Sequence, residues 1–121
     1  MNVESLSAYC LEKKGVTEDF PFDDVTMTMK VMGKIFAFIP LDSEKFVISL
    51  KCDPERALEL REQYSEIDGA YHLNKKHWNG IDCEGSLSDK FIKEMVDHSY
   101  ELVVKGLKKS EREALLNNEE N

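Results

Sequence analysis

The chain has 121 residues, of which 41% are hydrophobic and 33% charged, and its formal net charge is −8. This composition is typical of one soluble globular domain, and it excludes a disordered chain. Three widely spaced cysteines exclude a disulfide framework. No apolar run approaches the ~18 residues of a membrane helix, and the first residues do not resemble a secretory signal. We therefore expect a cytoplasmic protein with reduced thiols that does not bind a membrane.

The acidic charge lies mainly in the first half of the chain and in its C-terminal tail. The net charge is −6 over residues 1–69, +1 over residues 70–109 and −3 over residues 110–121. Proteins that bind nucleic acid through bulk charge are usually basic, because they neutralise phosphates. Any nucleic-acid contact of this chain would have to be local, and residues 70–109 are its one non-acidic block.

The first half of the chain predicts a helix followed by three strands. Asn2 is suited to cap the helix and Gly15 to end it, and an acidic connector containing Pro21 follows. Alternating and apolar stretches predict strands at residues 25–31, 34–40 and 45–51. A tight hairpin at Met32-Gly33 should join the first two strands. The second strand is apolar on both faces, so we expect it inside the sheet.

The second half predicts two short strands between helices. Asp53-Pro54 starts a helix that we expect to reach about Tyr64. Two short strands should flank residues 70–80, the second of them containing residues 81–83. Ser88 caps the longest helix, whose stripe at 3.6-residue spacing comprises Phe91, Ile92, Met95, Val96, Ser99, Leu102, Val103 and Leu107.

The order of elements is thus α-β-β-β-α-β-β-α with a short C-terminal helix, for which Ser110 and Glu113 form a capping box. Consecutive strands with segregated helices favour an α+β fold. We expect a two-layer α/β domain over residues 1–109, in which helices cover one face of an antiparallel sheet. Residues 110–121 would form a helical acidic tail. The second face of the sheet is then open, and function is expected there.

Residues 70–80, AYHLNKKHWNG, contain two histidines, two adjacent lysines and the only tryptophan. The string HLNKKHW, together with SLKCDPE before it and GSLSD and DHSYELVVKGL after it, resembles the MmcQ/YjbR family of small bacterial proteins. The resemblance extends over nearly the whole chain. It implies a two-layer fold similar to CyaY-like and secretion-chaperone-like domains, and DNA binding through a "double wing" of sheet and hairpins.

Carried onto this sequence, the resemblance implies a nucleic-acid-binding surface around residues 70–80. Lysines there suit phosphates, Asn74 suits a phosphate or a base edge, and Trp78 suits an unpaired base. The candidate nucleic-acid-binding residues are Lys51, His72, Asn74, Lys75, Lys76, His77 and Trp78.

Each of these residues also has a structural interpretation. Trp78 at the start of a strand suits core packing, and Lys75 with Lys76 suits a solvated loop. Asn74 suits a turn, in which it bonds to neighbouring backbone. The motif as a whole is therefore also expected to be a structural connection, with Tyr71, Leu73 and Trp78 buried and the residues at 74–76 exposed.

Metal binding and catalysis are the least supported functions. His72 and His77, with Asp82 and Cys83 nearby, match no zinc spacing, so we expect at least one histidine to bond locally and no metal to bind. Cys52 lies beside a helix start, where the pKa of a thiol is lowered. No nucleophile motif, P-loop or dinucleotide fingerprint accompanies it. We expect no enzyme and no cofactor.

Two functions follow as hypotheses. The first is a DNA-binding protein of the MmcQ/YjbR type. The alternative is a monomeric adaptor that binds a protein or peptide on its open sheet face, as secretion-chaperone-like folds do. An acidic surface suits a basic partner for such an adaptor.

Overall fold

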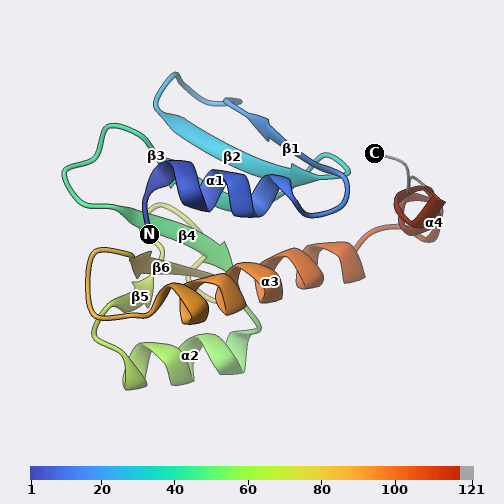
Figure 1. Cartoon of the computed structure of the whole chain (residues 1–121). Helices are drawn as coiled ribbons and strands as arrows, with labels where there is room; N and C mark the ends of the chain where they lie inside the picture. Colours follow the sequence, from blue (N-terminus) through green and yellow to red (C-terminus); the bar gives the residue numbers. More distant parts are fainter. Residues whose placement is uncertain (118–121) are drawn as a thin grey trace.

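A six-stranded antiparallel sheet organises residues 1–117, the part of the chain that the computed structural model describes. The order across the sheet is β1-β2-β3-β4-β6-β5 (Figure 1). The strands are β1 Val16–Asp19, β2 Thr26–Val31, β3 Lys34–Pro40, β4 Val47–Lys51, β5 Ile67–Gly69 and β6 Trp78–Asp82. The helices are α1 Val3–Leu11, α2 Pro54–Gln63, α3 Asp89–Lys105 and α4 Lys109–Asn117.

The predicted α+β class and order of elements are confirmed, with one strand added at the edge. β1 lies where the sequence indicates an acidic connector, and it pairs with β2 from Val16 to Asp19. An exposed edge strand needs no apolar alternation, because backbone hydrogen bonds hold it. Two side-chain contacts add to the pairing. The Thr28 hydroxyl donates to the carbonyl of Asp19 at 3.1 Å, and the Lys30 ammonium lies 2.8 Å from the Asp19 carboxylate.

The first three helices begin at the predicted caps. Asn2 accepts from the backbone of Ser5 in a capping box, and Asp53 accepts from the backbone of Arg56. Ser88 accepts from the third residue of α3. Each cap satisfies a backbone N–H that has no partner within the helix.

The predicted cap of the last helix is wrong by two residues. α4 starts at Lys109, so Ser110 lies inside its first turn, and the Glu111 carboxylate accepts from the backbone N–H of Lys108. Leu115 is buried and anchors the helix against the domain. Residues 118–121 of the predicted tail lie outside the described residues.

The hairpin between β2 and β3 is confirmed, and an irregularity follows it. Met32 and Gly33 both have positive φ, as a tight hairpin turn requires. The register then shifts: Lys30 lies opposite Ile35, whereas Met29 lies opposite Ala37. The extra residue on β3 is Phe36, which forms a bulge. Bulges re-aim side chains, and Phe36 lies among the core residues against α3.

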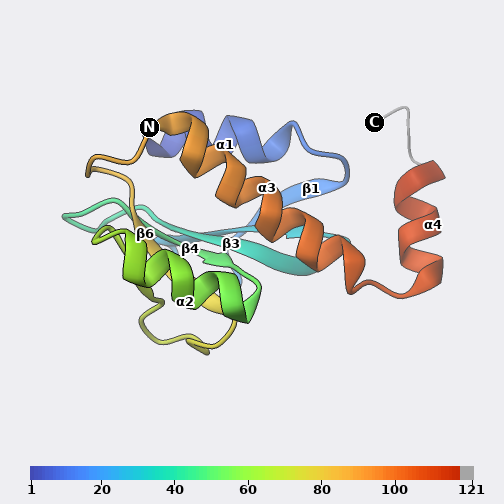
Figure 2. The same ribbon diagram turned by 90° about the horizontal axis from the view of Figure 1, so that it is seen from below.

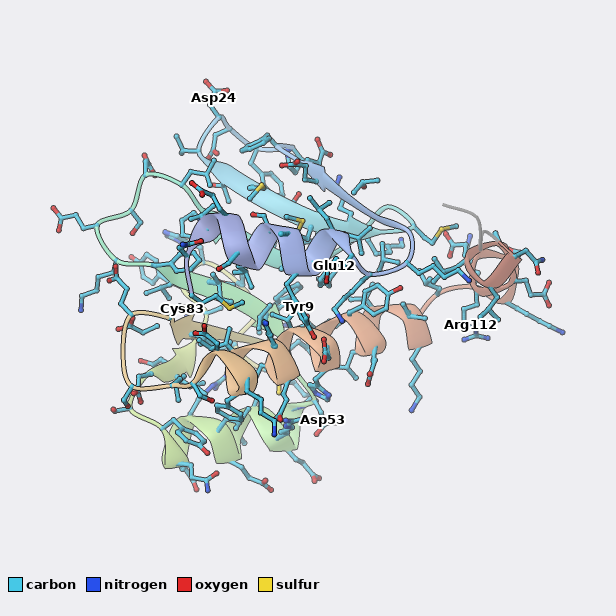
Figure 3. The ribbon with its side chains drawn as sticks, viewed as in Figure 1. Tyr9, Glu12, Asp24, Asp53, Cys83 and Arg112 are labelled. Atoms are coloured by element: carbon cyan, nitrogen blue, oxygen red, sulfur yellow. The ribbon has the colours of Figure 1, made fainter. Side chains whose placement is uncertain are left out.

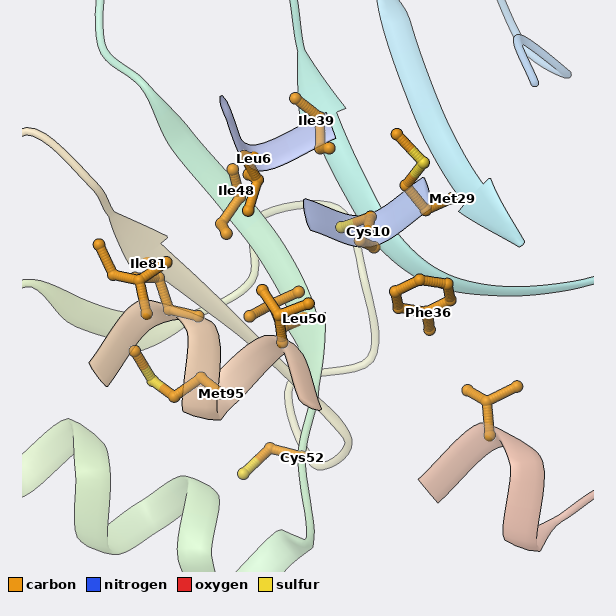
Figure 4. Packing of buried hydrophobic residues seen from close by; sticks show 14 of the residues in the cluster. Leu6, Cys10, Met29, Phe36, Ile39, Ile48, Leu50, Cys52, Ile81 and Met95 are labelled. Atoms are coloured by element: carbon orange, nitrogen blue, oxygen red, sulfur yellow. The ribbon is translucent and has the colours of Figure 1, made fainter. Parts of the chain in front are cut away.

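The core lies between the sheet and its helices. In Figure 2, α1 and α3 lie on one side of the sheet, and the loop after β5 lies on the other. Figure 4 shows the packing of buried side chains between these layers. The largest wholly buried apolar side chains are Phe36, Leu6, Met29, Ile39, Ile48, Leu50, Ile81 and Ile92. In residues 1–117, no helix has both the length and the apolar character that crossing a bilayer requires.

A buried serine joins α3 to the sheet where β3 and β4 separate. The Cα pairing of these two strands consists of Ala37–Leu50 and Phe38–Ser49. One step further along, the hydroxyl of Ser99 donates to the carbonyl of Phe36 at 2.5 Å and accepts from the Lys51 N–H at 2.9 Å. Ser99 thus satisfies two backbone groups at the point where the ladder ends.

A surface cluster joins α1 to α3. The Tyr9 hydroxyl donates to the Asp97 carboxylate at 2.6 Å, and the Lys13 ammonium lies 2.5 Å from the same oxygen. The hydrogen bond to Asp97 is the main reason that the pKa of Tyr9 is raised to about 12. Figure 3 places Tyr9 between the two helices. The cluster thus links the two helices that cover this side of the sheet.

Candidate binding surface on the open face of the sheet

The open face carries a hollow of about 830 Å³, here called the acidic hollow. Its floor comes from Phe38, Val47 and Gly80, on β3, β4 and β6. One wall is the loop between β1 and β2, with Phe22. The other is the loop after β5, with Tyr71, His72 and Leu73.

Strand pairing explains why these floor residues share one face. Ser49 lies opposite both Phe38 and Gly80, and Val47 lies opposite Asp82. Directly opposed residues in an antiparallel sheet point to the same side. Gly80 adds no side chain to the floor, and a Cβ there would be in ordinary van der Waals contact with a side-chain carbon of Val47, at 3.6 Å.

Aromatic side chains connect the floor to one wall. The ring of Phe22 stacks on Phe38 with centroids 6.2 Å apart, and Trp78 meets Phe38 edge-on at 5.2 Å. Phe22 is nevertheless 66% exposed, and Tyr71 on the opposite wall is 80% exposed. Exposed apolar groups gathered in one place mark interaction sites in soluble proteins.

The hollow is rimmed by carboxylates. Four acidic residues, Asp23, Glu66, Asp68 and Asp82, line it, and Lys45 is the one cation among the lining residues. Backbone N–H groups, chiefly that of Val25, lower the pKa of Asp23.

Glu66 is charged for a similar reason. The Ser86 hydroxyl, and then the Ser86 backbone N–H, lower the pKa of Glu66. Hydrogen bonds to the ionised form stabilise it. Asp23 and Glu66 therefore stay charged throughout the neutral pH range.

A second hollow of about 470 Å³, the lysine hollow, adjoins the first. Phe38 and Leu73 line both hollows. The lysine hollow is also lined by Lys34, Lys51 and Trp78, and its lining contains no carboxylate. Two adjacent hollows of opposite charge therefore meet at Phe38 and Leu73, and the lysine hollow also reaches the C-terminal end of α3, with Leu102, Val103 and Gly106 in its lining.

Five of the candidate nucleic-acid-binding residues line three hollows, two of which adjoin. Lys51 and Trp78 are Cα partners across β4 and β6, and both line the lysine hollow. Lys75 and Lys76 line a separate hollow of about 350 Å³, together with residues of α2. His72 lines the acidic hollow. The structure thus divides the predicted surface into three parts.

The burial expected for residues 70–78 is confirmed in part. Tyr71 was expected to be buried and is exposed, because β5 ends at Gly69 and Tyr71 belongs to the loop. Leu73 and Trp78 are half-buried.

The polar part of this loop is exposed, as predicted for residues 74–76. The turn role of Asn74 is confirmed. Its side-chain oxygen accepts from the backbone N–H of Lys76 at 2.9 Å, and its backbone carbonyl accepts from the backbone N–H of Trp78 at 3.0 Å.

The local hydrogen bond predicted for His72 or His77 is not formed. Within residues 1–117, neither imidazole has a hydrogen-bond partner; His77 instead contributes its backbone carbonyl to the N–H of Cys52 at 2.8 Å. In the same residues, no group of three histidine, cysteine or acidic side chains is placed to hold a metal ion.

The lowered pKa expected for Cys52 is wrong. The side chain is buried, and burial raises the pKa of its thiol despite the start of α2 beside it. Burial likewise raises the pKa of Cys10 and of Cys83 to about 12. All three cysteines therefore behave as small apolar core residues rather than as nucleophiles.

His98 on α3 makes a contact that the sequence does not predict. Its Nε2 accepts from the backbone N–H of Asp53 at 3.2 Å, where α2 begins. Figure 3 places Asp53 at that point. Burial, and then the charge of Arg56, lower the pKa of His98. Only neutral imidazole can accept this hydrogen bond.

We expect the stability of the protein to fall in mild acid through His98. The unfolded chain binds this proton near pH 6.5 and the folded chain at a lower pH. The contribution of His98 is therefore complete above pH 6.5, and it is lost as the pH falls through the folded-state pKa. Urea midpoints at pH 7.5 and pH 5 should differ less in His98→Gln than in the wild type. Equal differences in the two proteins would contradict this role.

Sequence reasoning missed most of the acidic hollow. The sequence offered one signal for Phe22: it is an aromatic residue in an acidic connector, where no core position is predicted. Val47 lies on the outward side of a predicted strand, which should have marked it as an apolar residue on the open face. Asp68 and Asp82 are far apart in sequence, and only the pairing of β5 and β6 places both on one rim.

These features define a small α+β domain whose antiparallel sheet has helices on one side and a hollowed, unpartnered face on the other. The chain belongs to the YjbR family, whose model matches residues 11–102. This agrees with the resemblance of its central motif.

Relatives and solved structures are similar to this chain along almost its whole length. YjbR of Escherichia coli K12 is 34% identical over 116 residues, 96% of this chain and 98% of the relative. YbdF of Escherichia coli O157:H7 is 31% identical, over 90% of this chain and 89% of the relative. The crystal structure of Deinococcus radiodurans DR2400 has 38% identity and a TM-score of 0.88, covering 94% of this chain and 87% of that chain. That of a Pseudomonas syringae protein has 27% identity and a TM-score of 0.72, covering 84% and 98%.

Proposed function

We propose that this chain is a protein-binding domain whose open sheet face takes a basic, apolar segment of a partner protein. The observation that carries the proposal is the acidic hollow, which combines an apolar floor with four carboxylates against one lysine. Apolar contact supplies affinity, and the rim selects a cationic partner and speeds its encounter. The volume of about 830 Å³ lies within the ~300–1,000 Å³ typical of binding pockets.

The negative charge of the acidic hollow disfavours two other occupants of this hollow, a second copy of this chain and a nucleic acid. A second copy of this chain would bring a net charge of −8 toward the carboxylate rim. A phosphate backbone would meet the same repulsion at the rim of the acidic hollow. A segment with lysine or arginine beside leucine or valine meets neither penalty.

We expect the double variant Asp68→Asn/Asp82→Asn to bind a basic peptide about fivefold more weakly at low salt. Each substitution removes one charge at the protein surface, from exposed Asp68 or half-buried Asp82, worth about 0.5 kcal/mol, and keeps the shape of the side chain. The probe is a short fluorescein-labelled peptide in which lysine alternates with leucine, and the measurement is fluorescence anisotropy.

The matched control is Glu59→Gln/Glu62→Gln. Both residues are exposed on α2 and lie outside the acidic hollow, and the variant changes the net charge by the same amount. This control should bind within twofold of the wild type. If the wild type does not bind the peptide at low salt, or if both variants lose affinity equally, the acidic hollow is not the binding site.

A nucleic acid is the second candidate, and one observation favours it. Lys34 and Lys51 line the lysine hollow beside Trp78, which offers cations for phosphates next to an aromatic ring for a base. Labelled single-stranded and duplex DNA, titrated at low and at physiological salt, test this function. Phosphate contacts require an affinity that falls as salt rises. The absence of binding at low salt would remove this candidate.

A further inference from the structure

The two hollows lie toward opposite ends of the same pair of strands. Val47 and its Cα partner Asp82 line the acidic hollow. Four residues further along β4, Lys51 and its partner Trp78 line the lysine hollow. At about 3.3 Å per residue, this step corresponds to roughly 13 Å.

The lysine hollow exists because two strands separate. Ser99 occupies the position where β3 and β4 would otherwise continue to pair, and the residues lining the opening include Lys34 on β3 and Leu102 on α3. Lys34 is exposed and Lys51 is half-buried. Neither ammonium group makes an ion pair within residues 1–117. Both are therefore free to pair with an incoming anion.

We infer that the partner segment is bipolar: its basic and apolar part lies in the acidic hollow, and a carboxylate about four residues away pairs with Lys34 and Lys51. This inference rests on the proposed function and adds the charge order and the spacing of the ligand. Phe38 and Leu73 are apolar and line both hollows, so a segment lying along β4 contacts them as it passes from one hollow to the other. Such a segment places each of its charges beside the opposite charge of this face.

The test compares peptides that differ in one place. The basic peptide carries either two glutamates or two glutamines, placed four residues beyond its last lysine. At low salt the glutamate peptide should bind the wild-type chain threefold to tenfold more tightly than the glutamine peptide. Lys34→Gln/Lys51→Gln should abolish this gain and leave binding of the glutamine peptide within twofold. The control Lys90→Gln/Lys109→Gln, with exposed lysines outside both hollows, should retain the gain.

Spacing gives a second measurement. Glutamates moved to eight residues beyond the last lysine should lose the gain, because they then lie past Lys51. The inference is overturned if the glutamine peptide binds and the glutamates add nothing, or if the gain survives in Lys34→Gln/Lys51→Gln. It is also overturned if oligothymidine binds through these two lysines and the glutamate gain is absent. If neither peptide binds, the proposed function fails, and this inference fails with it.

Discussion

Phe36→Ala should lower the free energy of unfolding by about 3–5 kcal/mol, the cost of truncating a large buried aromatic side chain. Phe36 is wholly buried, and its ring meets that of Tyr100 edge-on with centroids 5.5 Å apart. The bulge in β3 aims this ring into the core, so its loss leaves a cavity between the sheet and α3. Urea denaturation followed by circular dichroism measures the change.

The matched control is Phe22→Ala, which removes the same side chain from the open face. Phe22 is 66% exposed, so this variant should lose less than about 1 kcal/mol. It should instead weaken binding of the basic peptide. Equal destabilisation of Phe36→Ala and Phe22→Ala would contradict the placement of Phe36 in the core and of Phe22 on the open face.

Ser99→Ala should cost about 2–4 kcal/mol although it removes only one hydroxyl group. The hydroxyl serves both the Phe36 carbonyl and the Lys51 N–H, and alanine leaves both groups without a partner. Each unsatisfied buried backbone group costs about 1–3 kcal/mol. Ser7→Ala is the control, because the Ser7 hydroxyl is buried without a hydrogen-bond partner within residues 1–117. Its loss should change stability by less than about 0.5 kcal/mol, and a comparable loss in both variants would contradict the bridging role of Ser99.

Local signals were enough to predict most of the fold. Helix caps at Asn2, Asp53 and Ser88 and the Met32-Gly33 turn depend on residues that are close in sequence, and each is present. β1 could not be predicted in the same way. It is an exposed edge strand held by backbone pairing, and its side chains carry no alternation to detect.

The candidate site was less predictable, because it depends on which strands pair. The motif at residues 70–80 indicated one basic surface, yet its lysines and Trp78 line different hollows. Phe36 and Phe38 lie two residues apart in one apolar stretch, so a regular strand would point both to the same side. The bulge in β3 instead turns Phe36 into the core, whereas Phe38 faces outward. The acidic rim collects residues from three parts of the chain, which a single sequence cannot bring together.

The most direct test of the binding face is to map where the basic peptide contacts the protein. The ¹⁵N-labelled chain is titrated with the lysine–leucine peptide, and the amide chemical shifts are followed. If the peptide binds in the acidic hollow, the largest changes occur at Val47, Ser49, Asp68 and Gly80, around its floor and rim. Changes centred on α1 and α3, or on Lys75 and Lys76, would contradict binding there, as would a spectrum that the peptide does not change.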